Sequence, residues 1–285
     1  MLTNFYFKTR IMKKIMLLWV TIFLTINSFA QDYDSYCADA LTLIAKKNYT
    51  EAIVLLNNAI VLHPERDTAY NNRGYAKMCL HEFNAAIEDY TKGISIHKNP
   101  YTYSFRGYCF SKVGDTVKAF LDFDSSLQME PNFYLTLSKR GILYHYVDSV
   151  KLSINDIDRA LAIDSSQADL YYFRAKDKNA LGDYHGAIED SWSAIALDST
   201  NPGYYLTIGL SFQYLKDFNS AIQAYTVAIS WDSTYALGYY CRGFCQLKLN
   251  HRELALDDFK KAADLGSLDG KEMLILFGKK IELTE

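Results

Sequence analysis

The sequence predicts an all-α fold, a solenoid of about seven helical hairpins followed by a C-terminal capping helix. The first observation is a Tyr-x-x-Arg-Gly motif that returns about every 34 residues, at Tyr70, Tyr103 and Tyr239, with weaker copies between them. The second is that small residues recur at three fixed positions of this repeat. The third is that the large apolar residues follow the helical period. A repeat of this size cannot bury its apolar face alone, so each unit has to stack on its neighbours.

The first thirty residues have the pattern of a signal peptide. Lys13 and Lys14 precede a mostly apolar run, residues 15–26, and Ser28 and Ala30 place small residues at the −3 and −1 positions of a cleavage site. We therefore expect residues 1–30 to be removed. The alternative is an uncleaved membrane anchor, but the apolar run is shorter than the roughly 20 residues that a spanning helix needs.

Met12 is a more natural start of this leader than Met1, since residues 1–11 add an atypical extension. Residues 1–30 carry four basic residues and no acidic one, so their removal changes the formal net charge from −3 to −7. A chain this acidic is not expected to bind nucleic acid. We expect an exported protein, periplasmic or secreted, that meets a membrane only transiently through its signal peptide.

The repeats can be aligned with one another, and position 1 of each is the first residue of its range. The repeats are 33–66, 67–99, 100–133, 134–167, 168–201, 202–235 and 236–269. Positions 8, 20 and 27 are Gly, Ala or Ser in every repeat. Gly inside a helix costs roughly 1 kcal/mol relative to Ala, so the repeated Gly at position 8 implies that two helices approach closely.

Turn residues such as Gly182-Asp183 divide each repeat into two helices, and starts such as Asn201-Pro202 open new repeats. Each repeat is thus predicted to be a helix-turn-helix hairpin. Residues 270–285 follow the last repeat as a capping helix and tail. A helix on a membrane surface is the weaker alternative for this tail, because only Lys279 and Lys280 adjoin its apolar run.

These residues closely resemble the tetratricopeptide repeat, whose pattern is an aromatic residue, Leu-Gly, Tyr, then Ala, Phe and Ala, and finally Pro. The resemblance covers about residues 33–269. It implies a right-handed superhelical solenoid. Two departures are that the closing Pro is present only as Pro64 and Pro131, and that Arg replaces the Leu before Gly in five repeats.

The five repeats with Arg at position 7 also have Asp at position 23. The two repeats without the Arg have Asp39 and Ile208 there, and Leu55 and Ala224 at position 23. We therefore expect each Arg to pair with the Asp of its own repeat, because a guanidinium suits two-point pairing with a carboxylate. The alternative is a row of Arg side chains that binds anionic ligands. The expected structural ion pairs are Arg73 with Asp89, Arg106 with Asp122, Arg140 with Asp156, Arg174 with Asp190, and Arg242 with Asp258.

The sequence contains no specific catalytic motif, no histidine pair at metal-ligand spacing and no Gly-rich phosphate loop, so we predict no enzyme, cofactor or metal. Cys241 and Cys245 could be half of a metal site, but packing is the favoured interpretation. Cys79 and Cys109 could approach across adjacent repeats as a disulfide. Five cysteines in an exported chain leave at least one thiol unpaired or intermolecular.

In tetratricopeptide domains the groove is lined mainly by positions 2, 5, 9, 12 and 13 of the first helix. The partner-binding residues that the resemblance implies on this concave face are Asn71, Tyr75, Tyr101, Tyr108, Lys112, His145, Tyr146, Tyr172, Lys176, Tyr214, Tyr240, Phe244 and Lys248. Exposed Tyr would offer a large contact area with a polar tip. The alternative is that the rings pack between neighbouring helices. We favour groove exposure at positions 5 and 13 and leave position 9 undecided.

These features favour a non-enzymatic interaction scaffold of the cell envelope, which binds an extended or helical peptide segment of another protein on its Tyr-rich concave face. A second hypothesis is a structural subunit of an envelope assembly that uses its convex face or its ends. A third is a glycan-binding module, because rows of Tyr can stack on sugars.

Overall fold

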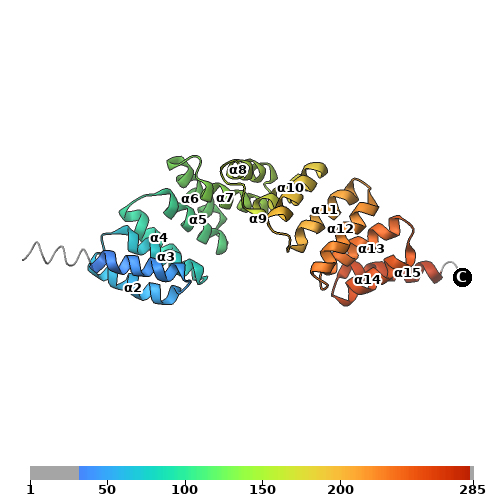
Figure 1. Ribbon diagram of the computed structural model, residues 1–285, viewed down its shortest axis with the longest axis horizontal. Coiled ribbons are helices and arrows are strands. Elements are labelled where there is room, and N and C mark those ends of the chain that lie inside the picture. The colour runs from blue at the N-terminus through green and yellow to red at the C-terminus, as the bar shows by residue number, and fades with distance from the viewer. Residues whose placement is uncertain (1–31, 283–285) are drawn as a thin grey trace, which may run out of the picture. The chain divides into compact units, whose positions relative to one another are not determined.

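The computed structural model describes residues 32–282, and every regular element in that range is a helix (Figure 1). The expected signal peptide lies outside the described residues. No helix within 32–282 combines the length and the apolar character that crossing a membrane requires. The all-α repeat fold is confirmed.

The described part of the chain divides into two compact units, unit 1 up to Thr136 and unit 2 from Leu137, with the boundary inside α7. The hairpins before α7 are 32–45 with α2 (Tyr49–Leu62), α3 (Asp67–Cys79) with α4 (Phe83–Ile96), and α5 (Pro100–Lys112) with α6 (Thr116–Met129). From the boundary onward they are α7 (Tyr134–Tyr146) with α8 (Val150–Ile163), α9 (Ala168–Ala180) with α10 (Tyr184–Leu197), α11 (Pro202–Tyr214) with α12 (Phe218–Trp231), and α13 (Ala236–Lys248) with α14 (Arg252–Asp264). The last helix is α15 (Leu268–Glu282).

The helices begin where local capping chemistry favours a start. The first helices of repeats 2 to 7 begin at the residues assigned to position 1, and the second helices begin at position 17. Before α11, the Asn201 side chain accepts a hydrogen bond from the Gly203 N–H, and Pro202 supplies the first helical residue. Before α10, Asp183 accepts from the Gly186 N–H in the same way.

Within each unit, the second helix of one hairpin packs against the first helix of the next. In unit 1 the contacts are α2 with α3 and α4 with α5, and in unit 2 they include α10 with α11, α12 with α13 and α14 with α15. The core is therefore distributed along the stack, as expected for a repeat that buries its apolar surface against its neighbours.

A match in size between positions 8 and 24 sets how closely the two helices of a hairpin approach. Position 8 is Gly where position 24 is aromatic or Ile, and Ala where position 24 is Leu or Ser. At Gly209 an added Cβ would lie 2.6 Å from Cδ1 of Tyr225, whose ring is fully buried. The pairs are Ala40–Leu56, Gly74–Tyr90, Gly107–Phe123, Gly141–Ile157, Ala175–Ser191, Gly209–Tyr225 and Gly243–Phe259.

We expect Gly209→Ala to lower the free energy of unfolding by about 1–2 kcal/mol in urea denaturation. Overpacking against the Tyr225 ring costs roughly 1–3 kcal/mol, which exceeds the roughly 1 kcal/mol that Ala gains over Gly in a helix. The Tyr225 ring has little freedom to move, since its hydroxyl donates to Gln213 Oε1 at 3.0 Å. The double variant Gly209→Ala/Tyr225→Leu copies the pairing of Ala40 with Leu56. In it, the Ala at position 209 should no longer lower the free energy of unfolding. Strict additivity of the two changes would contradict the size match.

All five Arg–Asp pairs are present in the structure. In each pair, Arg Nε and Nη2 donate to the two carboxylate oxygens of Asp over 2.5–2.9 Å. The Asp side chains are only 3–8% exposed. Each of these guanidinium groups is thus held by a carboxylate inside the fold, and this favours the structural interpretation over a row of anion-binding arginines.

The same guanidinium groups also tie a hairpin to the preceding one. Nη1 of Arg174 bonds to Asp158, and Nη1 of Arg242 bonds to Thr226 Oγ1 at 3.2 Å; both partners stand at position 25 of the repeat before. In repeat 6 the Arg is replaced by Ile208, and position 25 of repeat 5 is Trp192. An apolar residue therefore takes the place of the polar partner where the Arg is missing.

None of the five cysteines is in a disulfide, so the bond considered between Cys79 and Cys109 is not formed. Cys241 and Cys245 pack in an apolar cluster with Tyr225. Burial raises the pKa of the Cys241 thiol to about 11 and that of Cys245 to about 12, so both stay protonated near neutral pH. The described residues contain no group of three or more His, Cys, Asp or Glu side chains that could hold a metal ion.

Candidate functional site

The first helix of each hairpin has one side that is turned away from its own second helix. Position 8 faces the second helix, because a Cβ at Gly209 or Gly243 would meet the ring of Tyr225 or Phe259. At about 100° per residue, positions 2, 5, 9 and 13 lie together on one flank of the helix, about 60–140° around the axis from position 8. We call the residues at these four positions the inner face; in α13 they are Leu237, Tyr240, Phe244 and Lys248.

A ladder of polar contacts joins successive first helices in unit 2, always from position 12 to position 10 of the next repeat. His145 Nδ1 lies 2.6 Å from Asp177 Oδ1, and the Ser211 hydroxyl donates to Asn179 Oδ1 at 2.7 Å. A third rung joins the Cys245 thiol to Gln213 Oε1 at 3.4 Å. The rungs fix the register of α7, α9, α11 and α13.

The first rung buries a carboxylate with a single partner. Asp177 is 1% exposed, and its Oδ2 atom has no hydrogen-bond partner among the described residues. The His145 side chain is only 15% exposed and packs against the Phe173 ring at a centroid distance of 5.0 Å. His145, which the sequence assigned to the groove, thus serves mainly to join two helices.

The sequence-predicted residues of unit 2 differ in how far they reach solvent. Tyr146 and Tyr214, at position 13, are 71% and 58% exposed. Lys176 and Lys248 are also exposed, whereas Tyr172, Tyr240 and Phe244 are half-buried. Position 13 therefore provides the aromatic side chains that a partner can reach.

The expectation of groove exposure at position 5 needs correction. Tyr172 packs edge-on against Tyr204 at 5.1 Å, and its hydroxyl lies so close to Gly203 that a Cβ there would be 2.8 Å away. Burial raises the pKa of Tyr172 to about 12. Tyr240 packs on the cluster around Tyr225. Position 5 lies nearer the adjacent first helix than position 13 does, so its ring is partly covered.

In unit 1, Tyr101 and Lys112 are exposed and the other predicted residues are half-buried. The ring of Tyr75 meets Phe105 edge-on at 5.4 Å. Tyr108 meets Phe83 edge-on at 6.4 Å. Asn71 Nδ2 donates to Asp67 Oδ2 at 3.1 Å. At position 9, then, both Tyr rings pack between helices, which is the alternative interpretation.

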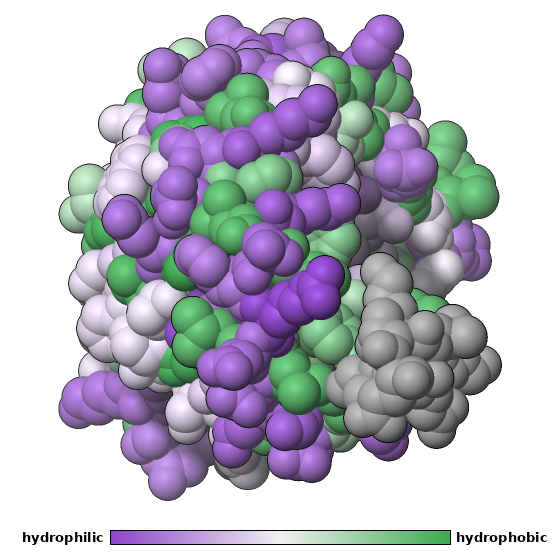
Figure 2. All heavy atoms as spheres, turned by 90° about the vertical axis from the view of Figure 1, so that its right-hand side faces the viewer, coloured by the Kyte–Doolittle hydropathy of each residue, from purple (hydrophilic) through white to green (hydrophobic). Residues whose placement is uncertain are grey.

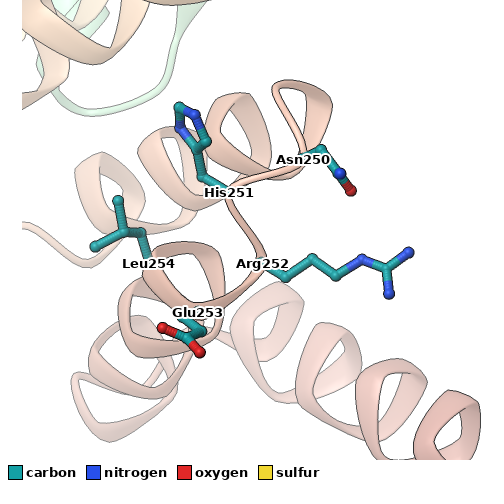
Figure 3. A pocket seen from close by; sticks show the side chains of 5 residues that line it. All are labelled: Asn250, His251, Arg252, Glu253 and Leu254. Atoms are coloured by element: carbon teal, nitrogen blue, oxygen red, sulfur yellow. The ribbon is translucent and has the colours of Figure 1, made fainter.

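The hollow in Figure 3 lies on the turn between α13 and α14 and is lined by five consecutive residues, Asn250 to Leu254. Their side chains point in different directions and do not converge on a common point (Figure 3). The hollow is open to solvent. We therefore regard the inner face as the candidate site.

Comparison with known proteins agrees with this architecture. Residues 202–235 match the profile of the tetratricopeptide repeat family. Anaphase-promoting complex subunit 3 of Schizosaccharomyces pombe is 24% identical over 156 residues, which cover 54% of this chain and 24% of that protein. Tetratricopeptide repeat protein 13 of Homo sapiens is 27% identical over 115 residues, which cover 40% of this chain and 13% of that protein. The chain spans about a quarter or less of these curated relatives.

Solved structures show the same fold. A tetratricopeptide repeat protein from Parabacteroides merdae superposes with a TM-score of 0.59 at 22% identity, covering 86% of this chain and 98% of that one. YrrB, described as a tetratricopeptide repeat protein with an unusual peptide-binding site, gives a TM-score of 0.59 at 21% identity, covering 68% and 99%. These matches support the tetratricopeptide repeat family, whose members generally mediate protein–protein interactions and are typically non-enzymatic scaffolds.

Proposed function

We propose that this chain is an exported, non-enzymatic scaffold of the cell envelope that binds a peptide segment of another protein along the inner face. The observation that carries the proposal is the exposure of Tyr146 and Tyr214 at position 13 of α7 and α11. Exposed Tyr side chains are frequent hot spots of interfaces, because they offer a large area and a polar tip at low entropic cost.

The ladder supports the proposal, because it holds the helices that carry these rings in a fixed register. Tyr146 meets the Phe173 ring edge-on at 5.7 Å, and Tyr214 stacks on Tyr184 at 5.0 Å. Rings held in place before a partner arrives lose little conformational entropy on binding. The location in the envelope rests on the signal-peptide pattern of residues 1–30.

The test is an affinity capture from envelope extract with the purified chain and the Tyr146→Ala/Tyr214→Ala double variant. We expect a protein captured by the wild type to be lost with this variant. Tyr172 and Tyr240 are poorer choices, since both are half-buried and their removal would weaken the fold.

The matched control is Trp192→Ala/Trp231→Ala, because these aromatic side chains are 52% and 49% exposed but lie on the second helices α10 and α12. The control should capture the partner as the wild type does. Loss of capture with the Trp variant and retention with the Tyr variant would place the interface away from the inner face.

A second candidate function, an assembly subunit that associates through its ends, is favoured by α15. Leu268, Ile275 and Leu276 are 74%, 59% and 58% exposed on this helix. If Leu268 is counted as position 1, Ile275 falls at position 8, where the repeats have Gly or Ala. Its side chain would prevent a further second helix from packing closely on α15 as in the repeats. Figure 2 views the side of the molecule where α15 lies, and hydrophobic residues show there in separate places among hydrophilic ones. Sedimentation at several concentrations distinguishes an associating chain from a monomeric receptor.

A further inference from the structure

The middle of the inner face in unit 2 is positively charged, although the chain as a whole is acidic. We call positions 5, 9 and 13 of α7, α9, α11 and α13 the central band. Its residues are Ser138, Ile142, Tyr146, Tyr172, Lys176, Ala180, Leu206, Leu210, Tyr214, Tyr240, Phe244 and Lys248. The charged residues of the band are Lys176 and Lys248, and the band contains no carboxylate. The chain as a whole has a formal net charge of −3.

Both lysines are held by an aromatic ring and not by an acid. Lys176 Nζ lies 5.4 Å from the ring centre of Tyr172, and Lys248 Nζ lies 5.1 Å from that of Phe244. Each ring stands four residues before its lysine, so the two side chains are neighbours on the helix surface. Among the described residues, no carboxylate oxygen lies within 4.0 Å of either ammonium group.

Another lysine of the same helix shows the contrast. Lys178 Nζ lies 2.9 Å from Asp190 Oδ2, so its charge is balanced inside the fold. Lys176 is exposed, and a cation–π contact positions its ammonium group without neutralising it. A positioned ammonium without a carboxylate partner, beside an apolar surface, is well suited to donate a charge-assisted hydrogen bond to a carboxylate.

The acids nearest to the band limit where such a carboxylate can bind. Asp169 stands at position 2 of α9, outside the band, but it lies close enough to Tyr172 to act with burial in raising the pKa of that phenol, whereas Asp177 is engaged with His145. On α15, Asp269 and Glu272 lie close enough to Tyr240 to act with burial in raising the pKa of that phenol. An acidic segment is therefore favoured along positions 9 and 13 of α9 to α13, and disfavoured at the position 2 end of α9 and at α15.

We propose that the central band binds an extended acidic segment, with one carboxylate on Lys176 and a second on Lys248. This rests on the proposed function and adds the chemistry of the partner.

Helices in contact lie about 8–10 Å apart, so two steps from α9 to α13 span roughly 16–20 Å. An extended chain rises about 3.4 Å per residue, which places the carboxylates about five or six residues apart. Leu210 and Tyr214 between the lysines call for apolar side chains in the middle of the segment.

The test selects peptides from a displayed random library of about 12 residues, long enough to span both lysines when extended. Three proteins are used: the purified chain, Lys176→Glu/Lys248→Glu and Tyr146→Ala/Tyr214→Ala. We expect the wild type to enrich peptides with two Asp or Glu residues five or six apart. The charge-reversed variant should bind these peptides at least about tenfold more weakly, and should itself enrich Lys or Arg at the same spacing.

The matched control is Lys151→Glu/Lys260→Glu, which makes the same change of charge at exposed lysines of α8 and α14. It should select the same peptides as the wild type. Enriched peptides that lack acidic pairs but depend on Tyr146 and Tyr214 would overturn the acidic partner and leave the proposed function standing. Enrichment that is unaffected by both the Lys176→Glu/Lys248→Glu and the Tyr variants, or no enrichment at all, would overturn both.

Discussion

Replacing Arg242 by isoleucine is expected to lower the free energy of unfolding of the last hairpin by about 3–5 kcal/mol. Asp258 is 5% exposed and accepts both of its hydrogen bonds from Arg242, at 2.8 and 2.7 Å. These bonds raise the pKa of the guanidinium. Without Arg242 the carboxylate stays buried with no cation beside it. Urea denaturation together with hydrogen exchange of the α13 and α14 amides measures the loss.

The chain offers its own control for this prediction. Repeat 6 has Ile208 and Ala224 where repeat 7 has Arg242 and Asp258. The double variant Arg242→Ile/Asp258→Ala copies that apolar pair and should recover most of the lost stability, because removing both partners leaves no uncompensated charge. If the double variant is as unstable as Arg242→Ile alone, the lost stability comes from the shape of the Arg side chain and not from the buried, unpaired carboxylate of Asp258.

Arg174→Met should cost less than Arg242→Ile. Asp190 keeps a second cation when the arginine is removed, since Lys178 Nζ lies 2.9 Å away. The comparison separates the cost of an isolated buried charge from the general cost of losing a long side chain. Equal losses at the two sites would show that Lys178 contributes nothing to the charge balance.

The Arg–Asp pairs could be predicted from one sequence, because the repeats act as an alignment of the chain with itself. Arg at position 7 and Asp at position 23 are present together in five repeats and absent together in two. The polar ladder could not be predicted in this way, because its residue types do not repeat from one repeat to the next. Its partners change chemistry at each rung, from His145 with Asp177 to Gln213 with Cys245, so no residue type recurs. The usable signal was the constant separation of 32 residues between polar side chains.

The exposure of the groove residues could be predicted only in part. A helical period tells which side of a helix a residue occupies, but not how far the neighbouring helix covers that side. Tyr172 and Tyr214 belong to the same inner face, yet the first is covered next to Gly203 and the second is 58% exposed. The size match of positions 8 and 24 was readable in principle, since Gly209 faces Tyr225 and Ala175 faces Ser191 within the same alignment.

His145→Ala is expected to be comparably damaging, with a loss of about 3–5 kcal/mol in unit 2. Asp177 is 1% exposed, and among the described residues its side chain has one hydrogen-bond partner, His145, at 2.6 Å. Removing the imidazole leaves the carboxylate between α7 and α9 without any partner, in a place that water does not reach. Urea denaturation at pH 7 measures the effect.

The next rung of the ladder supplies the matched control. Asn179→Ala removes a neutral partner of Ser211, so it should cost only about 1 kcal/mol. The double variant His145→Asn/Asp177→Ser gives the first rung the same two residue types as the second, Asn179 and Ser211. It should restore most of the stability. If His145→Ala and Asn179→Ala cost the same, the first rung carries no buried charge. In that case the register of the inner face depends on the packing of the helices and not on a polar ladder.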